Sequence, residues 1–568
     1  MATTQGRQIF MGNGIFKVPA NVTRVRVIAD CTAFSRFACD KAASYLLDAN
    51  GQLWAWGLNT LGQLGINNTT VQSSPVAVVG GQKFVNFWIP KTSAYSQAFA
   101  IDQNGQLYSW GSNTGLNLGQ NQGAGAFACS SPILVAGSGV GVGKTQYANL
   151  FPGFGQMMAL DVNGNLWGWG TNSLGQLGNG TNTPTGIGAQ VSSPTLVVGG
   201  IHWQLAECEN GSGTTFGIDT DNNLWAWGAN GGMLGIGALT PTQVSSPVKV
   251  VGGLKWRKVM SAPINTNYGI GIPGPIAFGL DFQGRVWSWG NNTYGQAGIA
   301  FPYQTVNSSP TLVSFPAGVQ IRDIAAATSA SNSDSIFYGL DYNGNIWAWG
   351  MCAPTLTNSG SFGNGNFNST NLNGSSTPTL VMGGHNFNKI FTKLNPSLGT
   401  DFVFAQDAGG GIWGWGNNGN GLLGNNNGTL NVSIPTAISG NNRFIWLDWD
   451  TANSGPVFAC DFFGQLWSWS WNQIGAAGNG TGVNSITTSS PIQVLLQKVV
   501  QMNNPQQDYF FDVVPGQSIP VIFGGLYTQF ADKLVGPVPH TNLPQSASAT
   551  AASPLTLIAN RVIVEYDQ

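Results

Sequence analysis

The stretch Asp48-Ala-Asn-Gly-Gln-Leu-Trp-Ala-Trp-Gly57 decides the fold, because close copies of it recur along the chain. In every copy the aspartate precedes the last position by nine residues, so the ten residues form one geometric unit. A recurring unit of constant length is typical of repeat architectures. The other seven copies begin at Asp102, Asp161, Asp219, Asp281, Asp341, Asp407 and Asp461.

Each copy predicts a β-hairpin. Pairs such as Asn50-Gly51 and Asn343-Gly344 favour a turn whose residues tolerate positive φ. After the turn, large and small side chains alternate, as in Leu53-Trp-Ala-Trp56, which indicates a strand packed between neighbouring sheets. We expect the aspartate to accept hydrogen bonds from turn N–H groups, because a calcium loop needs several oxygen ligands and these units offer one carboxylate.

A second motif follows each hairpin. Gly-Gln-Leu-Gly occurs at 62–65 and 175–178, and a Ser-Ser-Pro element such as the one ending at Pro75 comes later. A short β-rich run, such as residues 76–79, is then expected to form another strand. Successive units are 54 to 66 residues apart, a length that suits the blades of a β-propeller.

The repeat resembles that of the RCC1 family, whose units carry a "G-x-L-x-x-W-G-x-N-x-x-G-Q-L-G … P" pattern. The resemblance covers roughly residues 31–500 and implies a closed, all-β propeller, which in that family usually has seven blades. Because eight units are legible in this chain, we predict eight blades, with seven as the alternative.

The two ends of the chain lie outside the repeat and resemble one glycine-rich β-domain of bacteriophage tail-fibre and tail-tip proteins. The motifs that carry this resemblance occur at 14–27, 513–521 and 562–566. A closed propeller brings its own ends together, as insertion into a surface loop requires. We therefore predict a small split β-sandwich made of residues 1–30 and 501–568, with the propeller of residues 31–500 inserted into it.

Composition excludes several classes of function. Only 8% of the residues are charged, against roughly 25% in an ordinary domain, and the formal net charge is -2. The 21 Lys and Arg are scattered, which argues against nucleic-acid binding. No apolar run is long enough for a membrane helix, and the N-terminus lacks the pattern of a signal peptide, so we expect synthesis in a cytoplasm.

The sequence predicts neither catalytic residues nor a cofactor or metal site. The six Cys show no paired ligand spacing and the three His lie far apart. Gly141-Val-Gly-Lys-Thr145 resembles the end of a phosphate loop but lacks the full motif, so we expect an ordinary loop. The 21 Trp could stack on carbohydrate, although the inter-blade core is the favoured interpretation, also for those outside the repeat at 88, 203, 256, 446, 449 and 471.

The longest connection, between residues 351 and 378, is the candidate surface-recognition loop. Long loops on a rigid scaffold often carry binding specificity, and asparagine with aromatic residues suits sugar or polar surfaces, although an ordered spacer is equally compatible. The candidate residues are Phe362, Asn364, Asn366, Phe367, Asn368 and Asn371.

Taken together, the patterns predict a non-enzymatic bacteriophage virion protein of the tail: a fibre, tail-tip or baseplate component. Its propeller would attach the particle to a host-surface polysaccharide or protein. The other expected partners are tail proteins, and we expect a homo-oligomer within the virion. Two alternatives stay open: a decoration or collar protein that stabilises the particle, and a cellular RCC1-like protein-interaction scaffold.

Overall fold

The computed structural model of the protein describes the propeller and strands of both chain ends. The described residues are 5–10, 14–17, 24–30, 34–39, 43–48, 50–90, 96–114, 116–121, 128–153, 155–182, 190–208, 213–262, 276–293, 295–299, 306–328, 335–352, 360–365, 373–392, 402–440, 443–449, 456–461, 466–470, 488–493, 506–512, 518–523, 555–557 and 561–567. Over these residues the fold is all-β, with a single short 3₁₀ turn, η1 (Gly419–Gly421), and no helix long and apolar enough to cross a membrane.

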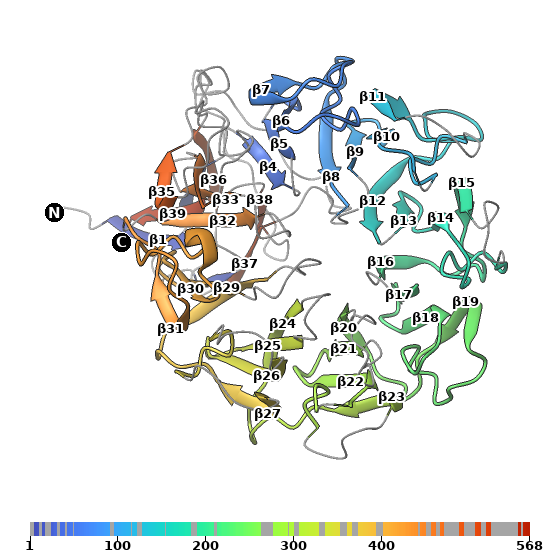
Figure 1. Cartoon of the computed structure of the whole chain (residues 1–568). Coiled ribbons are helices and arrows are strands. Elements are labelled where there is room, and N and C mark those ends of the chain that lie inside the picture. Colours follow the sequence, from blue (N-terminus) through green and yellow to red (C-terminus); the bar gives the residue numbers. More distant parts are fainter. Residues whose placement is uncertain are drawn as a thin grey trace.

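Eight four-stranded antiparallel sheets form a ring of eight blades, each built from consecutive strands (Figure 1). Blade 1 contains β4 (Phe34–Cys39), β5 (Ala43–Asp48), β6 (Leu53–Gly57) and β7 (Gln72–Ala77), and blade 2 contains β8 (Phe84–Trp88), β9 (Gln97–Asp102), β10 (Leu107–Gly111) and β11 (Cys129–Leu134). Blade 3 contains β12 (Tyr147–Pro152), β13 (Gln156–Asp161), β14 (Leu166–Thr171) and β15 (Gln190–Leu196), and blade 4 contains β16 (Trp203–Cys208), β17 (Thr214–Asp219), β18 (Leu224–Ala229) and β19 (Gln243–Lys249). Blade 5 contains β20 (Trp256–Ala262), β21 (Ile276–Asp281), β22 (Val286–Asn291) and β23 (Val306–Leu312), and blade 6 contains β24 (Ile321–Thr328), β25 (Ser335–Asp341), β26 (Ile346–Cys352) and β27 (Asn373–Leu380). Blade 7 contains β28 (Phe387–Phe391), β29 (Phe402–Asp407), β30 (Ile412–Gly416) and β31 (Val432–Ala437), and blade 8 contains β32 (Phe444–Trp449), β33 (Pro456–Asp461), β34 (Leu466–Ser470) and β35 (Thr488–Gln493). The predicted eight blades are confirmed, and the seven-bladed alternative does not apply.

The repeated ten-residue unit is the hairpin between the second and third strands of a blade. In blade 6, β25 pairs with β26 so that Leu340 faces Ile346, and Gly344 takes a φ of 84° in the turn between them. Only glycine adopts such a φ without a steric penalty, which explains the Asn-Gly pairs of the sequence. The first strand of each blade lies nearest the centre of the ring, and the fourth lies at its rim (Figure 1).

The second Trp of the repeat joins neighbouring blades, and in six of the eight units the described part of the chain shows its indole N–H bonded to the preceding blade. Trp227 of blade 4 is fully buried and donates its Nε1–H to the carbonyl of Gln176 in blade 3 at 2.9 Å. Gly178 lies so close to this indole that a Cβ there would stand 2.7 Å from Nε1. The Gly-Gln-Leu-Gly motif of one blade is therefore the socket for the tryptophan of the next. Matching bonds join Trp110 to Gln63, Trp169 to Asn117, Trp289 to Met233, Trp415 to Ser361 and Trp469 to Leu422.

The core interpretation also holds for most of the tryptophans outside the repeat. Trp88, Trp203, Trp256 and Trp449 are all buried, with exposed fractions of 7% or less. Trp446 is half-buried, and Trp471 lies outside the described residues.

The Ser-Ser-Pro element lies inside the fourth strand of the blade, whereas its sequence pattern predicted a strand that begins after it. In blade 3, β15 runs from Gln190 to Leu196 and includes Pro194. Its pairing with β14 is irregular between Gly168 and Gly170. An outer strand tolerates proline and a bulge, because its free edge needs no hydrogen-bond donor.

Both chain ends meet in two further sheets. One contains β1 (Gln5–Phe10), β39 (Arg561–Asp567), β3 (Arg24–Asp30) and β36 (Gln506–Asp512), in that order, and the other β2 (Gly14–Lys17), β37 (Ser518–Phe523) and β38 (Leu555–Leu557). β3 precedes blade 1 and β36 follows blade 8, and the two pair antiparallel with Asp30 opposite Gln506. The terminal sheets therefore tie together the first and last blades. The domain boundaries predicted at residues 30 and 501 stay predictions.

Candidate interaction surface

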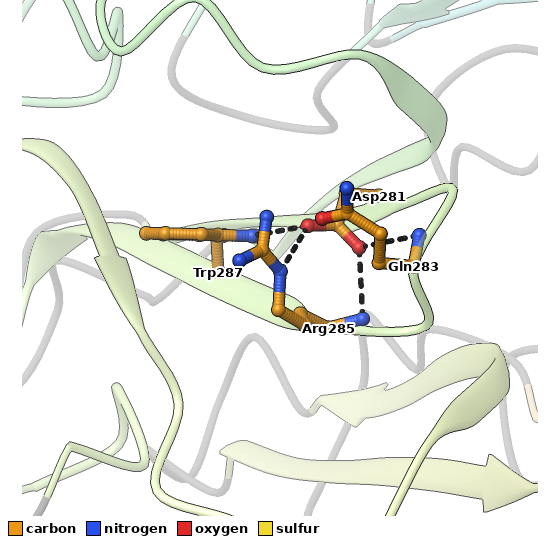
Figure 2. A network of polar contacts seen from close by, with 4 residues as sticks. All are labelled: Asp281, Gln283, Arg285 and Trp287. Carbon is orange, nitrogen blue, oxygen red and sulfur yellow. Dashed lines mark hydrogen bonds and ion pairs between the residues drawn. The ribbon is translucent and has the colours of Figure 1, made fainter.

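The hairpin turns hold the acidic residues of the repeat. Asp281, 2% exposed, accepts hydrogen bonds from the backbone N–H groups of Gln283 and Arg285, both at 2.9 Å (Figure 2). Its other oxygen accepts from Arg285 Nε at 2.7 Å and from Trp287 Nε1 at 3.0 Å. The predicted turn-stabilising role of the aspartate is thereby confirmed, and the structure adds the first Trp of the repeat as a donor.

The same network recurs around the ring. Backbone donors two and four residues after the aspartate bond one carboxylate oxygen, and a Trp indole six residues after it bonds the other. Members with the indole bond are Asp48, Asp161, Asp219, Asp341, Asp407 and Asp461. These carboxylates serve their own turns, and among the described residues no three His, Cys, Asp or Glu side chains gather in a group that could hold a metal ion.

The candidate recognition loop is only partly described, and one of its residues belongs to the core. Phe362 is 4% exposed and packs in a cluster with Val381 and Trp415, so its ring is not available at the surface. It occupies the place of the leucine in Gly-Gln-Leu-Gly, a correspondence that irregular spacing hid in the sequence. Asn364 is half-buried. Asn366, Phe367, Asn368 and Asn371 lie outside the described residues.

Charged side chains on the innermost strands pair between blades. Arg36 of blade 1 donates from Nη1 to Oδ1 of Asn86 in blade 2. Lys258 of blade 5 donates from Nζ to Asp323 Oδ1 and to Ile324 O in blade 6, each at 2.7 Å. All these charged groups therefore join neighbouring blades at the centre of the ring.

The guanidinium of Arg36 lies among aromatic rings near the centre of the ring of blades. It lies over the rings of Phe87 and Trp88, 5.4 and 5.5 Å from their centroids. Burial lowers the pKa of Arg36 to about 10, and the nearby Asp448 carboxylate acts in the opposite direction. The side chain stays cationic at neutral pH, and it bonds blade 1 to blade 2 through Asn86.

The face of the ring that carries the hairpin turns, here called the turn face, has a different composition. It includes the turns, the beginnings of the innermost strands and the connections that lead into them. Phe282 and Tyr342 directly follow the turn aspartates of blades 5 and 6, and are 59% and 57% exposed. Lys255 and Arg257 flank the first residue of β20 and are also exposed. Exposed aromatic rings beside arginine are typical of protein interfaces.

These turn-face residues were not among the predicted site residues. A signal for them exists in the sequence: the position after each repeat aspartate is occupied by Gln103, Val162, Thr220, Phe282, Tyr342 or Ala408 in blades 2 to 7. A large aromatic ring at a turn position that has no core to enter points to surface recognition. The phosphate-loop-like segment 141–145 lies in the connection between β11 and β12, where no helix follows it.

Comparison with known proteins identifies the repeat. The family profile described as "Regulator of chromosome condensation (RCC1) repeat" matches residues 50–87 and 283–331. The RCC1 domain-containing protein RUG3, mitochondrial, of Arabidopsis thaliana is 26% identical over 284 residues, which cover 48% of this chain and 57% of the relative. The E3 ubiquitin-protein ligase HERC2 of Homo sapiens is 27% identical over 196 residues, which cover 34% of this chain and 4% of the relative.

The chain thus spans a twenty-fifth of one relative and just over half of the other. Among solved structures, yeast RCC1 (Prp20) in its crystal structure with Kap60 is 17% identical, with a TM-score of 0.48, and the match covers 73% of this chain and 88% of that one. The eight-bladed ring makes this chain a β-propeller protein, and its repeats are similar to the RCC1 repeat.

Proposed function

We propose that this protein is a non-enzymatic protein-interaction scaffold that presents partners with the faces of an eight-bladed propeller. The observation that carries the proposal is the turn face of blades 5 and 6. There the backbone is held by hydrogen-bonded turns, and exposed aromatic rings stand beside exposed cations. Rigid aromatic and arginine side chains lose little conformational entropy on binding, which is why they dominate protein interfaces.

Two of the described cysteines, Cys208 and Cys460, lack the properties of a catalytic nucleophile. Burial raises the pKa of the Cys208 and Cys460 thiols far above the usual range, so both stay protonated at neutral pH. A nucleophilic cysteine needs a lowered pKa and access to substrate. Neither thiol has these properties.

The proposal is tested with the purified full chain and an extract of the cells that express it. Cross-linking followed by mass spectrometry should link one protein reproducibly to lysines of the propeller, such as Lys83, Lys144 or Lys255. That protein, once purified, should then bind the full chain saturably. If no protein binds the full chain saturably, the scaffold proposal is wrong.

A role in a bacteriophage tail is the second candidate. The three flanking segments that carry the phage resemblance contribute strands to the two terminal sheets, namely β2, β3, β37 and β39. Neither of the two curated relatives named above is a virion protein, so this role rests on the flanking motifs alone. A tail adhesin should bind intact host cells and block adsorption of the particle, whereas a decoration protein or an intracellular scaffold should do neither.

A further inference from the structure

Five residues on the turn face of blades 5 and 6, four of them exposed and Arg322 half-buried, are here called the blade 5/6 patch. They are Lys255, Arg257, Phe282, Arg322 and Tyr342. Lys255 and Arg257 lie on either side of Trp256, which pairs with Asp281 directly before Phe282. Arg322 and Tyr342 hold the positions equivalent to Arg257 and Phe282 in the next blade, because Ile321 pairs with Asp341. The repeat thus places an arginine and an aromatic ring side by side in two adjacent blades.

Hydrogen bonds hold the cations of the patch in place. Arg257 donates from Nη1 to the Tyr342 hydroxyl at 3.0 Å, across the boundary between blades 5 and 6. Lys255 donates from Nζ to Asp221 O at 2.7 Å and to Asn223 Oδ1 at 3.1 Å. Arg322 donates from Nη2 to Phe387 O at 2.6 Å. A guanidinium has five N–H donors, so Arg257 can keep its bond to Tyr342 and still bind a carboxylate.

The exposed charge of the patch is positive. The neighbouring carboxylates of Asp281 and Asp341 are each 2% exposed and accept hydrogen bonds within their own turns. Asp323 is engaged by Lys258. Of these three acids only Asp323 is substantially exposed, and it is paired with Lys258, whereas the exposed Asp221 belongs to the blade 4 turn whose carbonyl accepts from Lys255.

We propose that the blade 5/6 patch binds an acidic segment of a protein partner. Carboxylates of the segment would bind Arg257 and Lys255, and an adjacent apolar side chain would pack on Phe282 and Tyr342. This inference rests on the proposed scaffold function and names the surface and the chemistry of the partner. Nucleic acid fits less well, because the turn carboxylates lie beneath the patch and tight phosphate binding needs a longer series of cations.

The test uses the full chain and a fluorescein-labelled copolymer of glutamate and tyrosine, with binding followed by fluorescence anisotropy. The wild-type chain should bind it more weakly as salt is raised from about 50 to about 200 mM, since the contacts are partly ionic. The double variant K255E/R257E should lose about tenfold or more in affinity. F282S/Y342S should also weaken binding, because the copolymer loses its apolar contact.

The matched control is K83E/K144E, which reverses two exposed lysines of the turn face on blades 2 and 3 and changes the net charge equally. It should bind within about twofold of the wild type. Equal losses in K255E/R257E and K83E/K144E would show general charge attraction and overturn the proposal. The proposal would also be overturned if the wild-type chain bound duplex DNA and K255E/R257E abolished this DNA binding but kept copolymer binding. Thermal melts of every variant exclude unfolding as the cause.

Failure of this inference differs from failure of the scaffold function. If K255E/R257E still captures the cross-linked partner with unchanged affinity, the scaffold stands and its binding surface lies elsewhere on the ring. If no partner is captured by the wild-type chain, the scaffold function fails whatever the copolymer does.

Discussion

The carboxylate of Asp281 shows how one side chain can organise a whole turn. Two backbone N–H groups, a guanidinium and an indole all donate to it, and little of the residue is open to water. Removing such an acceptor leaves several donors unsatisfied, which costs more than the net gain from any one bond.

We therefore expect D281A to lower the free energy of unfolding by about 1–3 kcal/mol and to lower the melting temperature measured by circular dichroism. The control is D221A, in the turn of blade 4. Asp221 is exposed, and the carboxylate that accepts the hydrogen bonds of its turn is that of Asp219. The loss of the Asp221 side chain should therefore change the melting temperature little. Equal melting temperatures for the two variants would contradict the assigned role of Asp281.

The turn of blade 4 also predicts a pH dependence. Burial alone raises the pKa of Asp219, but bonds from Trp225, Asn223 and Asp221 outweigh it, so the pKa lies below its ordinary value. Because the folded-state pKa is lower than the unfolded value of about 3.9, the carboxylate stabilises the fold above that pH. This contribution is lost as pH falls through the folded-state pKa.

Melting temperatures should accordingly fall as the pH is lowered from about 5 to about 2. The decrease should be smaller in D219N than in the wild type, because an amide does not titrate in this range. D221N serves as the control and should follow the wild-type curve. A D219N curve with the wild-type slope would exclude this carboxylate as a contributor.

At the scale of elements, the joint between blades depends on the close approach of a glycine to a tryptophan. Gly178 has a φ of 67°, and a Cβ there would stand 2.7 Å from Trp227 Nε1. The indole of Trp227 cannot move away from an added Cβ, because it is fully buried and bonded to the carbonyl of Gln176.

G178A should therefore destabilise the protein by about 2–4 kcal/mol, which combines backbone strain with overpacking of the joint. G200A is a matched control, since Gly200 has a φ of 63° and no atom within 4 Å of its would-be Cβ. Its cost should be confined to about 1–2 kcal/mol of backbone strain. Urea titrations followed by tryptophan fluorescence compare G178A with G200A. Equal unfolding midpoints for these variants would contradict the role of Gly178 at the boundary between blades.

Sequence patterns identified the hairpins and the number of blades, because both depend on local spacing and turn chemistry. They misplaced the outer strand, since Ser-Ser-Pro looks like a strand break until the strand is known to have a free edge. They also assigned Phe362 to a surface loop. Only the packed ring shows that this phenylalanine fills the socket that leucine fills in other blades.

At the scale of the whole molecule, the ring closes between blades 8 and 1. Cys39 of blade 1 donates its backbone N–H to Asp448 Oδ2 of blade 8 at 3.1 Å, and Phe37 stacks on Trp446 with centroids 5.2 Å apart. Because every blade is made of consecutive strands, no strand is exchanged across this boundary. The pairing of β3 with β36 supplies a second tie between the first and last blades.

If the terminal sheets are a unit of their own, they should fold without the propeller. Deleting residues 31–500 and joining the ends with a short glycine linker should leave a folded β-protein, because within the described part of the chain β1, β3, β36 and β39 pair with one another and with no blade strand. Circular dichroism with a cooperative thermal melt checks this expectation. An unfolded product would show that the terminal sheets need the ring.

By itself, the sequence determined the all-β repeat, the number of blades and the role of the turn aspartates, because the turn chemistry lies within each repeated unit and the blades can be counted from its eight copies. The tertiary structure decided what distant segments do together. It paired Arg257 with Tyr342 across 85 residues, seated Trp227 and its equivalents in the preceding blade, and buried Phe362. The physical reason is that the neighbours of a side chain in the closed ring decide whether it is buried in the core or exposed at an interface. The sequence of a single repeat does not specify those neighbours.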